Sequence, residues 1–321
     1  MEEERNEEEQ LLMYQIVDAV SVVMTVFKAR AFGALEQSLL PLVMQMAQAG
    51  SDPYHAKMAV FVLCDVVEQC VHAHAGGAHH AARYLPAINA ALVAGAQSPD
   101  PAVRQPAFFG LGLVAQHAGG GIADSAVAQH AQLLQQYVST AAVWQGEQVN
   151  AAENAVAAIG RVCEFRATTA GACCGAMRAL TTTSIAMSMA PRLTPRALTP
   201  FPRSSSAFPP GVDACALYGV WLSHLPLRND MPESKSTIEQ LCRLVSAGTP
   251  ALLTGGAQRM GEIARVLVEA VCIEDEGLAS LHRTVGGLLQ QIGAQLDAAT
   301  RGAIAASAGA DERSVLASVW A

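Results

Sequence analysis

The stretch SPDPAVRQPAFFGLGLVAQHAGG, residues 98–120, decides the fold of this chain. It places Gly110 and Gly112 inside a run of large apolar residues that follows an Asp100-Pro101 pair. Each glycine lowers helix propensity by about 1 kcal/mol relative to alanine. Proline fits the first turn of a helix, where its missing amide proton would have no partner. We therefore expect a helix that starts at Pro101 and whose glycines are tolerated because another helix packs closely on their backbone.

The apolar spacing of this helix returns twice, once before it and once after it, at the same interval in both directions. We call this recurrence the repeat register. Each set follows the pattern i, i+1, i+4, i+5, i+7, which is one face of an α-helix with a small residue in its middle. The three sets are Ala59, Val60, Leu63, Cys64, Val66; Ala107, Phe108, Leu111, Gly112, Val114; and Ala155, Val156, Ile159, Gly160, Val162. The register predicts three equivalent helices in successive repeats.

Other helices of similar length are expected between these three, at 82–97 and 124–140. Two helices in roughly 40 to 48 residues is typical of HEAT and armadillo repeats. One helix pair cannot bury its apolar face alone, so neighbouring pairs stack into a superhelix. The predicted fold is therefore all-α, an α-solenoid of HEAT-type antiparallel helix pairs.

The repeat register breaks once, because the next equivalent of Gly160 is Cys242, whereas an unbroken register would place it at position 208. The intervening segment is rich in Thr, Ser, Pro and Arg and has no sustained helical period, which predicts a disordered insertion in one repeat. The predicted organisation is an acidic disordered N-terminus (1–10), HEAT repeats (11–166), the insertion (167–210), further HEAT repeats (211–308) and a C-terminal tail (309–321).

Composition limits the classes of partner. The net charge is −8, of which the first ten residues contribute −5, and the body has no basic footprint that would indicate nucleic acid. The acidic start differs from the basic start of a secretory signal. The apolar stretch IVDAVSVVMTVF, residues 16–27, is interrupted by Asp18 and is short for a bilayer. We expect a soluble, unexported chain without membrane insertion.

Cysteine and histidine give no strong metal motif. The eight cysteines include no C-x-x-C pair, and most lie in apolar helical patterns as small buried hydrophobes, which suits a reducing compartment. The loop CVHAHAGGAHH, residues 70–80, is a flexible connection, whereas zinc prefers four ligands on a constrained frame. Its candidate ligands are Cys70, His72, His74, His79 and His80. No metal or cofactor is expected.

The sequence contains no recognisable catalytic arrangement. The glycine-rich pieces at 117–121 and 248–256 lack the lysine and spacing of a phosphate-binding loop and suit helix ends. Neither a Ser/His/Asp nor a Cys/His arrangement can be identified, so we expect a protein that is not an enzyme. Asp100 and Arg104 are expected to form structural pairs within the turn or between repeats, with a cargo contact as the alternative.

Four blocks resemble the C-terminal HEAT-repeat region of the importin-beta family of nuclear transport receptors, most closely the importin-five or karyopherin-beta-three subfamily. The blocks occur in the family's order, and the string W-L-S-x-L-P-L is the most specific of them. The insertion and the acidic start depart from the family. The blocks are LCDVVEQC (63–70), PAVRQPAFFGLGLVAQHAGG (101–120), VNAAENAVAAIGRVCEF (149–165), and VWLSHLPLRND (220–230) followed by IEQLCRLV.

The resemblance implies a nuclear import receptor segment, present in the cytoplasm, in the nucleus and at the nuclear pore. It implies binding to protein cargo with basic nuclear localisation signals and to phenylalanine-glycine nucleoporins. Ran GTPase would be a partner of the complete receptor, held by N-terminal repeats that this fragment lacks. The rival hypothesis is a HEAT-repeat scaffold or regulatory subunit, because fold alone does not separate these functions.

The resemblance also implies site residues. In the family the second helices of repeats line the inner surface, which suggests protein binding by Glu68, Asn150, Glu153 and Asn154; ordinary solvated helix faces are the alternative. The first helices would form grooves for phenylalanine rings. The candidate groove residues are Leu92, Ala96, Leu133 and Tyr137, and the candidate aromatic anchors are Trp144 and Trp221, for which core packing is the alternative.

Overall fold

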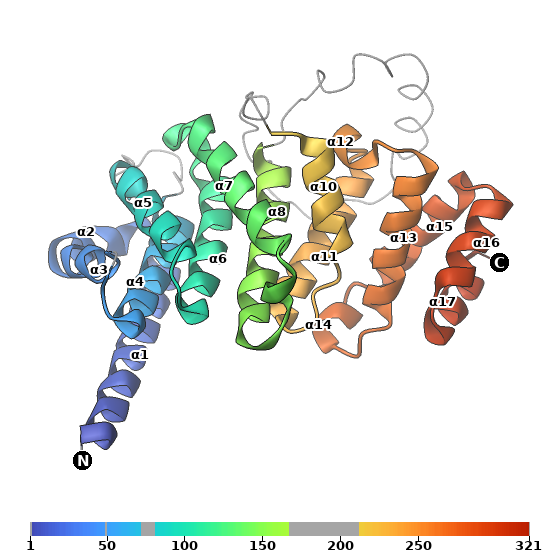
Figure 1. Cartoon of the computed structure of the whole chain (residues 1–321). Coiled ribbons are helices and arrows are strands. Elements are labelled where there is room, and N and C mark those ends of the chain that lie inside the picture. The colour runs from blue at the N-terminus through green and yellow to red at the C-terminus, as the bar shows by residue number, and fades with distance from the viewer. Residues whose placement is uncertain (1, 49, 72–80, 167–211, 321) are drawn as a thin grey trace. The chain divides into compact units, whose positions relative to one another are not determined.

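The computed structural model describes residues 2–48, 50–71, 81–166 and 212–320. These residues form helices joined by turns and contain no strand, which confirms the all-α prediction. Contacts divide the chain into two compact units, Met1–Arg166 and Ala167–Ala321, and each unit is a stack of antiparallel helix pairs (Figure 1). The predicted insertion at 167–210 lies outside the described residues.

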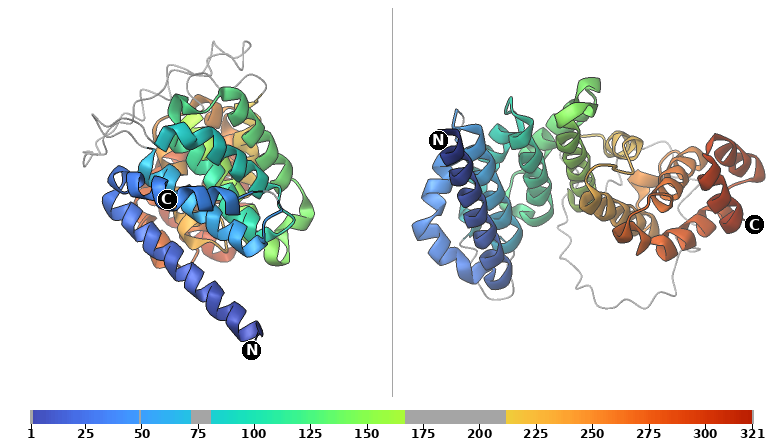
Figure 2. Two further views of the ribbon diagram at one scale, coloured as in Figure 1. Left: turned by 90° about the vertical axis from the view of Figure 1, so that its left-hand side faces the viewer. Right: turned by 90° about the horizontal axis from the view of Figure 1, so that it is seen from below.

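The first unit has two layers of helices (Figures 1 and 2). Its second layer is a row of neighbouring long helices, and each helix after the first pairs with a shorter helix of the first layer that precedes it. The second layer is α1 (Glu2–Phe27), α4 (Pro53–Asp65) with the π-helical turn η1 (Val66–Cys70), α6 (Pro101–His117) and α8 (Val149–Arg166). The first layer is α2 (Ala29–Ser38) with α3 (Leu40–Met46), α5 (Leu85–Ala96) and α7 (Asp124–Val138).

The predicted repeat register is confirmed, because its three residue sets lie on α4 with η1, on α6 and on α8, and every member is buried. The glycines of α6 lie where helices meet. A Cβ on Gly110 would lie 2.6 Å from Cδ2 of Leu92 and 2.8 Å from Sγ of Cys64. The predicted start is also confirmed, since the Asp100 carboxylate accepts a 2.8 Å hydrogen bond from the Ala102 amide. Close packing of neighbouring helices therefore explains the glycines of the opening stretch: side chains of Leu92 and Cys64 crowd Gly110, whereas the backbone of Ala158 crowds Gly112.

The second unit is also built from two layers of helices. Its layers are α10 (Ala214–Ser223), α13 (Ala257–Val271) and α16 (Ala298–Ser307) against α11 (Met231–Ser246), α15 (His282–Gln295) and α17 (Ala310–Trp320). Two short helices, α12 (Pro250–Leu253) and α14 (Glu276–Ala279), lie in the connections. The residues of the W-L-S-x-L-P-L string, Trp221, Leu222, Leu225 and Leu227, are all buried. The string is therefore a packing motif that joins α10 to α11.

Both predicted ends of the chain need correction. Residues 1–10 were expected to be disordered, but α1 begins at Glu2, and Tyr54 donates a hydroxyl hydrogen bond to the carbonyl of Gln10. Glutamates in the first turns of a helix interact favourably with its dipole. Residues 309–321 were expected to be a tail, but Ala310–Trp320 form α17, and Trp320 Nε1 donates a 2.8 Å hydrogen bond to the Leu289 carbonyl. The Trp320 contact orders the C-terminal segment, and the N-terminal segment is the start of a helix that continues to Phe27.

The length of α1 corrects a further expectation. Apolar residues extend N-terminal to the 16–27 stretch, and the segment Glu7–Phe27 has 21 residues and a mean hydropathy of 1.6. Among the described residues it is the one helix long and apolar enough to cross a membrane. The core helix of a soluble protein and a signal sequence near the N-terminus can have the same length and apolar composition, so these two properties alone do not assign the helix to a membrane. One face of α1 packs on α4, where Met24 is buried.

Candidate protein-binding surface

The repeat register brings three polar residues to equivalent positions of the second layer. These are Glu68 in η1, Gln116 on α6 and Glu164 on α8, and all three are half-buried. We call them the Glu68 row. Because their helices are neighbours in one layer, the row presents carboxylate and amide groups along one side of the first unit. Such groups accept hydrogen bonds from cationic side chains and from the backbone of an extended peptide.

A second carboxylate stands close to Glu68. Asp65 accepts a hydrogen bond from the Ser21 hydroxyl of α1. Burial raises the pKa of Asp65, the Ser21 hydrogen bond lowers it, and the nearby charge of Glu68 raises it. Asp65 and Glu68 thus form a partly desolvated acidic pair beside the α1–α4 contact.

Glu68 lies in an unusual backbone element. Residues Val66–Cys70 form a π-helical turn that continues α4. π-Helical turns are rare and occur frequently at functional sites, because the extra residue changes the direction of a side chain. No sequence pattern predicted this turn, since its apolar residues keep the spacing of an ordinary α-helix.

Two aromatic rings accompany the Glu68 row at positions that the repeat register also relates, Phe61 on α4 and Phe109 on α6. Lys57 Nζ lies 5.9 Å from the centroid of Phe61, and Arg161 Cζ lies 4.8 Å from the centroid of Phe109. Both rings are half-buried and both carry a cation over their face. The surface therefore combines acidic groups with rings that already accept cations.

Of the four residues predicted to bind protein, two reach solvent in the structure and two are buried. Glu68 is half-buried and Asn150 is exposed, but Glu153 and Asn154 have only 3% and 4% of their surface exposed. The reason is that α8 is buried on all sides from Ala151 to Cys163. The Asn154 side chain donates a 3.0 Å hydrogen bond to the carbonyl of Asn150. In this structure Glu153 and Asn154 belong to the interior.

Asp100 and Arg104 have separate partners in the described part of the chain, and no direct pair joins them. Asp100 caps α6, whereas Arg104 Nη1 donates to the Ser98 and Pro99 carbonyls at 2.6 and 2.8 Å. Arg104 also reaches the next repeat, through a 3.3 Å hydrogen bond to Gln148 Oε1 and a 5.7 Å contact with the Tyr137 ring. The contact between repeats is therefore made by the arginine alone.

The predicted first-layer groove is also altered by burial. Leu92 and Ala96 are buried, while Leu133 and Tyr137 remain half-exposed. The Tyr137 ring packs 4.6 Å from that of Phe108. The buried Trp221 serves packing, and Trp144 donates a 2.8 Å hydrogen bond from Nε1 to the Val138 carbonyl.

Among the described residues no group of three or more His, Cys, Asp or Glu could hold a metal ion. Residues His72, His74, His79 and His80 of the histidine-rich loop lie outside the described part of the chain. Burial raises the pKa of Cys64 and Cys163, and it raises that of Cys70 and Cys242 to about 11. These thiols remain protonated at neutral pH and behave as small hydrophobes, as expected.

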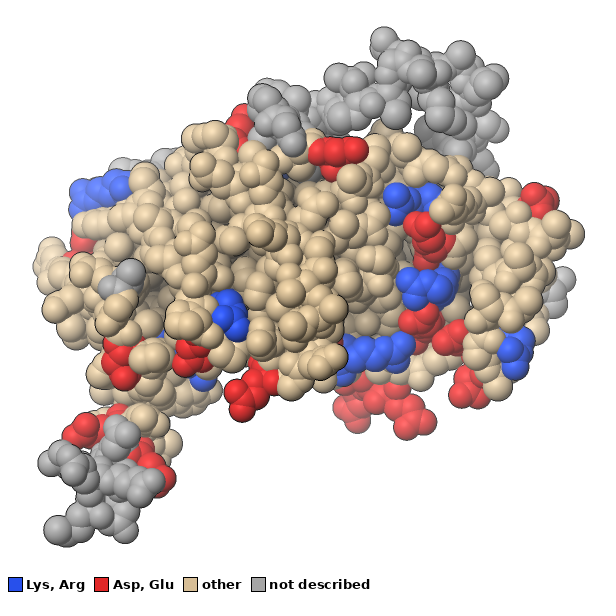
Figure 3. Space-filling model, viewed as in Figure 1, with Lys and Arg blue, Asp and Glu red and all other residues tan. Residues whose placement is uncertain are grey.

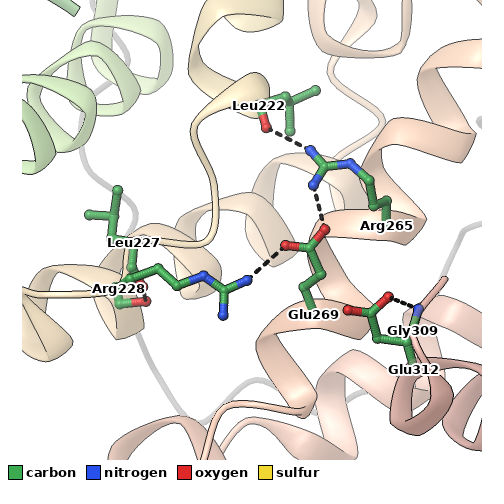
Figure 4. Close-up of polar contacts among 8 residues, drawn as sticks. Leu222, Leu227, Arg228, Arg265, Glu269, Gly309 and Glu312 are labelled. Carbon is green, nitrogen blue, oxygen red and sulfur yellow. Dashed lines mark hydrogen bonds and ion pairs between the residues drawn. The ribbon is translucent and has the colours of Figure 1, made fainter. Parts of the chain in front are cut away.

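Charged side chains in the second unit form contacts between helices and loops. Glu269 of α13 accepts hydrogen bonds from Arg228 Nη2 at 3.1 Å and from Arg265 Nη1 at 2.5 Å (Figure 4). Arg228 belongs to the loop that connects α10 to α11, so Glu269 ties this loop to α13. On the face of the described residues in Figure 3, Lys and Arg side chains are interspersed with acidic and uncharged ones.

No protein-family model matches the chain. Solved structures do match it. The crystal structure of Kap121p bound to RanGTP aligns with a TM-score of 0.62 and 17% identity, covering 98% of this chain and 24% of that one. Two Kap121p mutants align with TM-scores of 0.60 and 0.62, also at 17% identity, covering 97% of this chain and 23% of theirs. The chain therefore spans about a quarter of the length of these relatives, and it has the helical-repeat fold of Kap121p, an importin-beta family karyopherin.

Proposed function

We propose that this chain is a segment of a nuclear transport receptor that binds protein cargo through the second layer of its first unit. The observation that carries the proposal is the likeness to Kap121p over 98% of the chain, since that protein was solved in complex with RanGTP. The cargo sites, the pore partners and the location in cytoplasm and nucleus are part of this proposal.

The Glu68 row supports a basic, extended cargo segment. Its carboxylates pair with Lys or Arg of the cargo, and Gln116 and the exposed Asn150 offer amides to a peptide backbone. The half-buried rings of Phe61 and Phe109 offer apolar contacts beside them. A single exposed ion pair contributes about 0.2–1 kcal/mol. Useful affinity therefore requires several such contacts along one peptide.

Pore proteins are the second partner that we propose. A phenylalanine ring gains about 1.5–3 kcal/mol on burial before ordering costs, so binding to phenylalanine-glycine repeats is weak at each groove and depends on multivalency. Leu133 and Tyr137 are the candidate groove residues that remain half-exposed. We propose no stable complex between this chain alone and Ran-GTP, because the resemblance assigns Ran binding to repeats that precede this region.

A peptide titration tests the cargo surface. The full chain is titrated with a fluorescent lysine-rich peptide at low and at high salt. Glu68→Lys should weaken binding about fivefold, equivalent to about 1 kcal/mol, and the salt dependence should become shallower. The matched control is Glu147→Lys, which makes the same charge change at an exposed position before α8. An equal loss in both variants would mean that peptide binding follows net charge and not this surface.

A second titration separates the proposal from the scaffold hypothesis. The chain is presented with a multivalent phenylalanine-glycine ligand and, separately, with Ran loaded with GTP. Weak binding to the first and none to the second is expected. Indifference to both the basic peptide and the phenylalanine-glycine ligand would favour a scaffold or regulatory subunit, and tight, GTP-dependent Ran binding would contradict our assignment of the receptor's parts.

A further inference from the structure

Arg166, the last residue of α8, holds the C-terminal end of the neighbouring helix α6. Its Nε donates a 3.0 Å hydrogen bond to the carbonyl of Ala115, and its Nη1 donates a 2.6 Å hydrogen bond to the carbonyl of Gly119. Ala115 lies in the last turn of α6, where carbonyls have no partner within the helix and a cation suits the helix dipole. Arg166 therefore ties α8 to α6 and to residues 118–123, which we call the α6–α7 connection.

This Arg166 clamp lies in the interior. Only 4% of the surface of Arg166 is exposed, and its Nη2 is buried without a hydrogen-bond partner. Burial lowers the pKa of the guanidinium, whereas the charge of Asp124, an exposed residue at the start of α7, raises it. The buried cation is thus offset by two carbonyl oxygens and one exposed carboxylate, which leaves little room for a second positive charge.

A second buried polar group lies against the clamp. His130 of α7 has 1% of its surface exposed, and neither ring nitrogen has a hydrogen-bond partner among the described residues. Burial lowers the pKa of His130, and so does the charge of Arg166 on α8. Of the other elements packed on α7, α6 brings the titratable His117 in its last turn, and η4 (Ala141–Trp144) has no charged residue. Protonation of His130 would place two cations together in the interior.

The α6–α7 connection is the part of this neighbourhood that can yield. It contains the three glycines Gly119–Gly121, and Gly119 has a φ of 49° with nothing within 4 Å of its Cβ position. The Gly121 amide donates a 2.8 Å hydrogen bond to the Ala118 carbonyl, and Arg166 holds Gly119. By contrast, α8 is buried on all sides from Ala151 to Cys163. A segment with so few contacts opens at a lower free energy than the packed helices.

We propose that protonation of His130 releases the Arg166 clamp, so that the α6–α7 connection opens in acid while the helices around it stay folded. In the closed form the imidazole is neutral and the guanidinium binds the carbonyls of Ala115 and Gly119. A protonated imidazole carries two N–H donors, and water reaches them once the connection moves away. This inference does not depend on the proposed function.

Hydrogen exchange of the full chain at pH 7.5 and at pH 5 tests the device. A solvated histidine has a pKa near 6.5 whereas the pKa of His130 in the closed form is about 4, so the open population should rise about thirtyfold between these two pH values. The Gly121 amide should lose protection by this factor, after correction for its intrinsic exchange rate. Non-denaturing urea should leave its exchange unchanged, because local opening exposes little surface, whereas amides in the middle of α8 should respond to urea.

Histidine variants identify the titrating group. His130→Leu should keep Gly121 protected at both pH values. His117→Leu, at the end of α6, and His55→Leu, on the surface, are the matched controls and should keep the thirtyfold loss. Arg166→Met should open the connection already at pH 7.5. Equal protection of Gly121 in the wild type at both pH values, a loss that persists in His130→Leu, or exchange of Gly121 with the urea dependence of α8 overturns the proposal.

The imidazole of His130 gives a second readout that needs no variant at this position. Its ring-proton NMR signal in the wild type should titrate together with the loss of Gly121 protection. In Arg166→Met the midpoint of this titration should move to higher pH, because the cation that opposes protonation is gone. An unchanged midpoint in that variant would overturn the coupling between the two side chains.

Discussion

A Cβ on Gly112 of α6 would lie 3.0 Å from Cα of Ala158 on α8. The two helices thus touch through their backbones at the middle of the repeated apolar face. A side chain larger than hydrogen at Gly112 has to separate α6 from α8 or displace the Arg161 side chain, whose Cδ lies equally close to the same point. This contact explains why the sequence accepts a glycine with poor helix propensity in the core.

We expect Gly112→Val to destabilise the first unit by about 1–3 kcal/mol, the usual range for overpacking a core. The measurement is urea unfolding followed by circular dichroism. Gly33→Val is the matched control, because Gly33 lies on helix α2 with nothing within 4 Å of its Cβ position. Equal unfolding midpoints for the two variants would show that α6 and α8 can separate without cost.

His130 makes stability depend on pH. Burial, with a smaller contribution from the Arg166 charge, lowers the pKa of His130 to about 4, and neither ring nitrogen has a hydrogen-bond partner among the described residues. The unfolded chain takes up this proton near pH 6.5 whereas the folded chain remains neutral. Stability is therefore full above pH 6.5 and falls as the pH decreases toward 4.

Between pH 7 and pH 5 the loss from His130 should be about 2 kcal/mol in the free energy of unfolding. His130→Leu should remove most of this loss. His55→Leu is the control, because His55 lies on the surface beside Asp52. An unchanged pH dependence in the His130 variant would show that the side chain is protonated in the folded state.

Gly293 and Trp320 hold the last helix in place. A Cβ on Gly293 of α15 would lie 2.4 Å from Cδ1 of Trp320, so Gly293→Ala should displace the indole and weaken the docking of α17. Faster amide exchange in Ala310–Trp320 is the expected result. Gly287→Ala on the same helix has nothing within 4 Å and should leave α17 protected. Equal protection in both variants would contradict the proposed contact.

Glu269 should anchor the loop between α10 and α11. Glu269→Gln removes the charge that binds Arg228 and Arg265, whose side chains are partly exposed. Because solvent screens such pairs, we expect a cost of only about 0.5–1 kcal/mol, and it should shrink at high salt. Glu262→Gln, which loses a pair with Arg259 alone, is the control. A salt-independent loss would show that packing and not charge holds the loop.

Of the four residues predicted to bind protein, Glu68 and Asn150 reach solvent, whereas Glu153 and Asn154 are buried on α8. Whether the solvent-accessible residues bind protein stays a prediction. Helical spacing tells which residues share a face, and it does not tell how many neighbours cover that face. The π-helical turn at Glu68 was missed because its apolar residues keep the spacing of an ordinary α-helix.

The sequence by itself determined the helix pairs, the repeat register and the start of α6, because apolar periodicity, Asp-Pro capping and close-packed glycines act within a few turns of one helix. Only the tertiary structure decided that α1 and α17 are ordered, that Arg104 and Glu269 join successive elements, and that Leu92 and Ala96 are closed to ligands. Each of these depends on which helices become neighbours, and burial against a neighbour changes the free energy of a side chain without leaving a local pattern in the sequence.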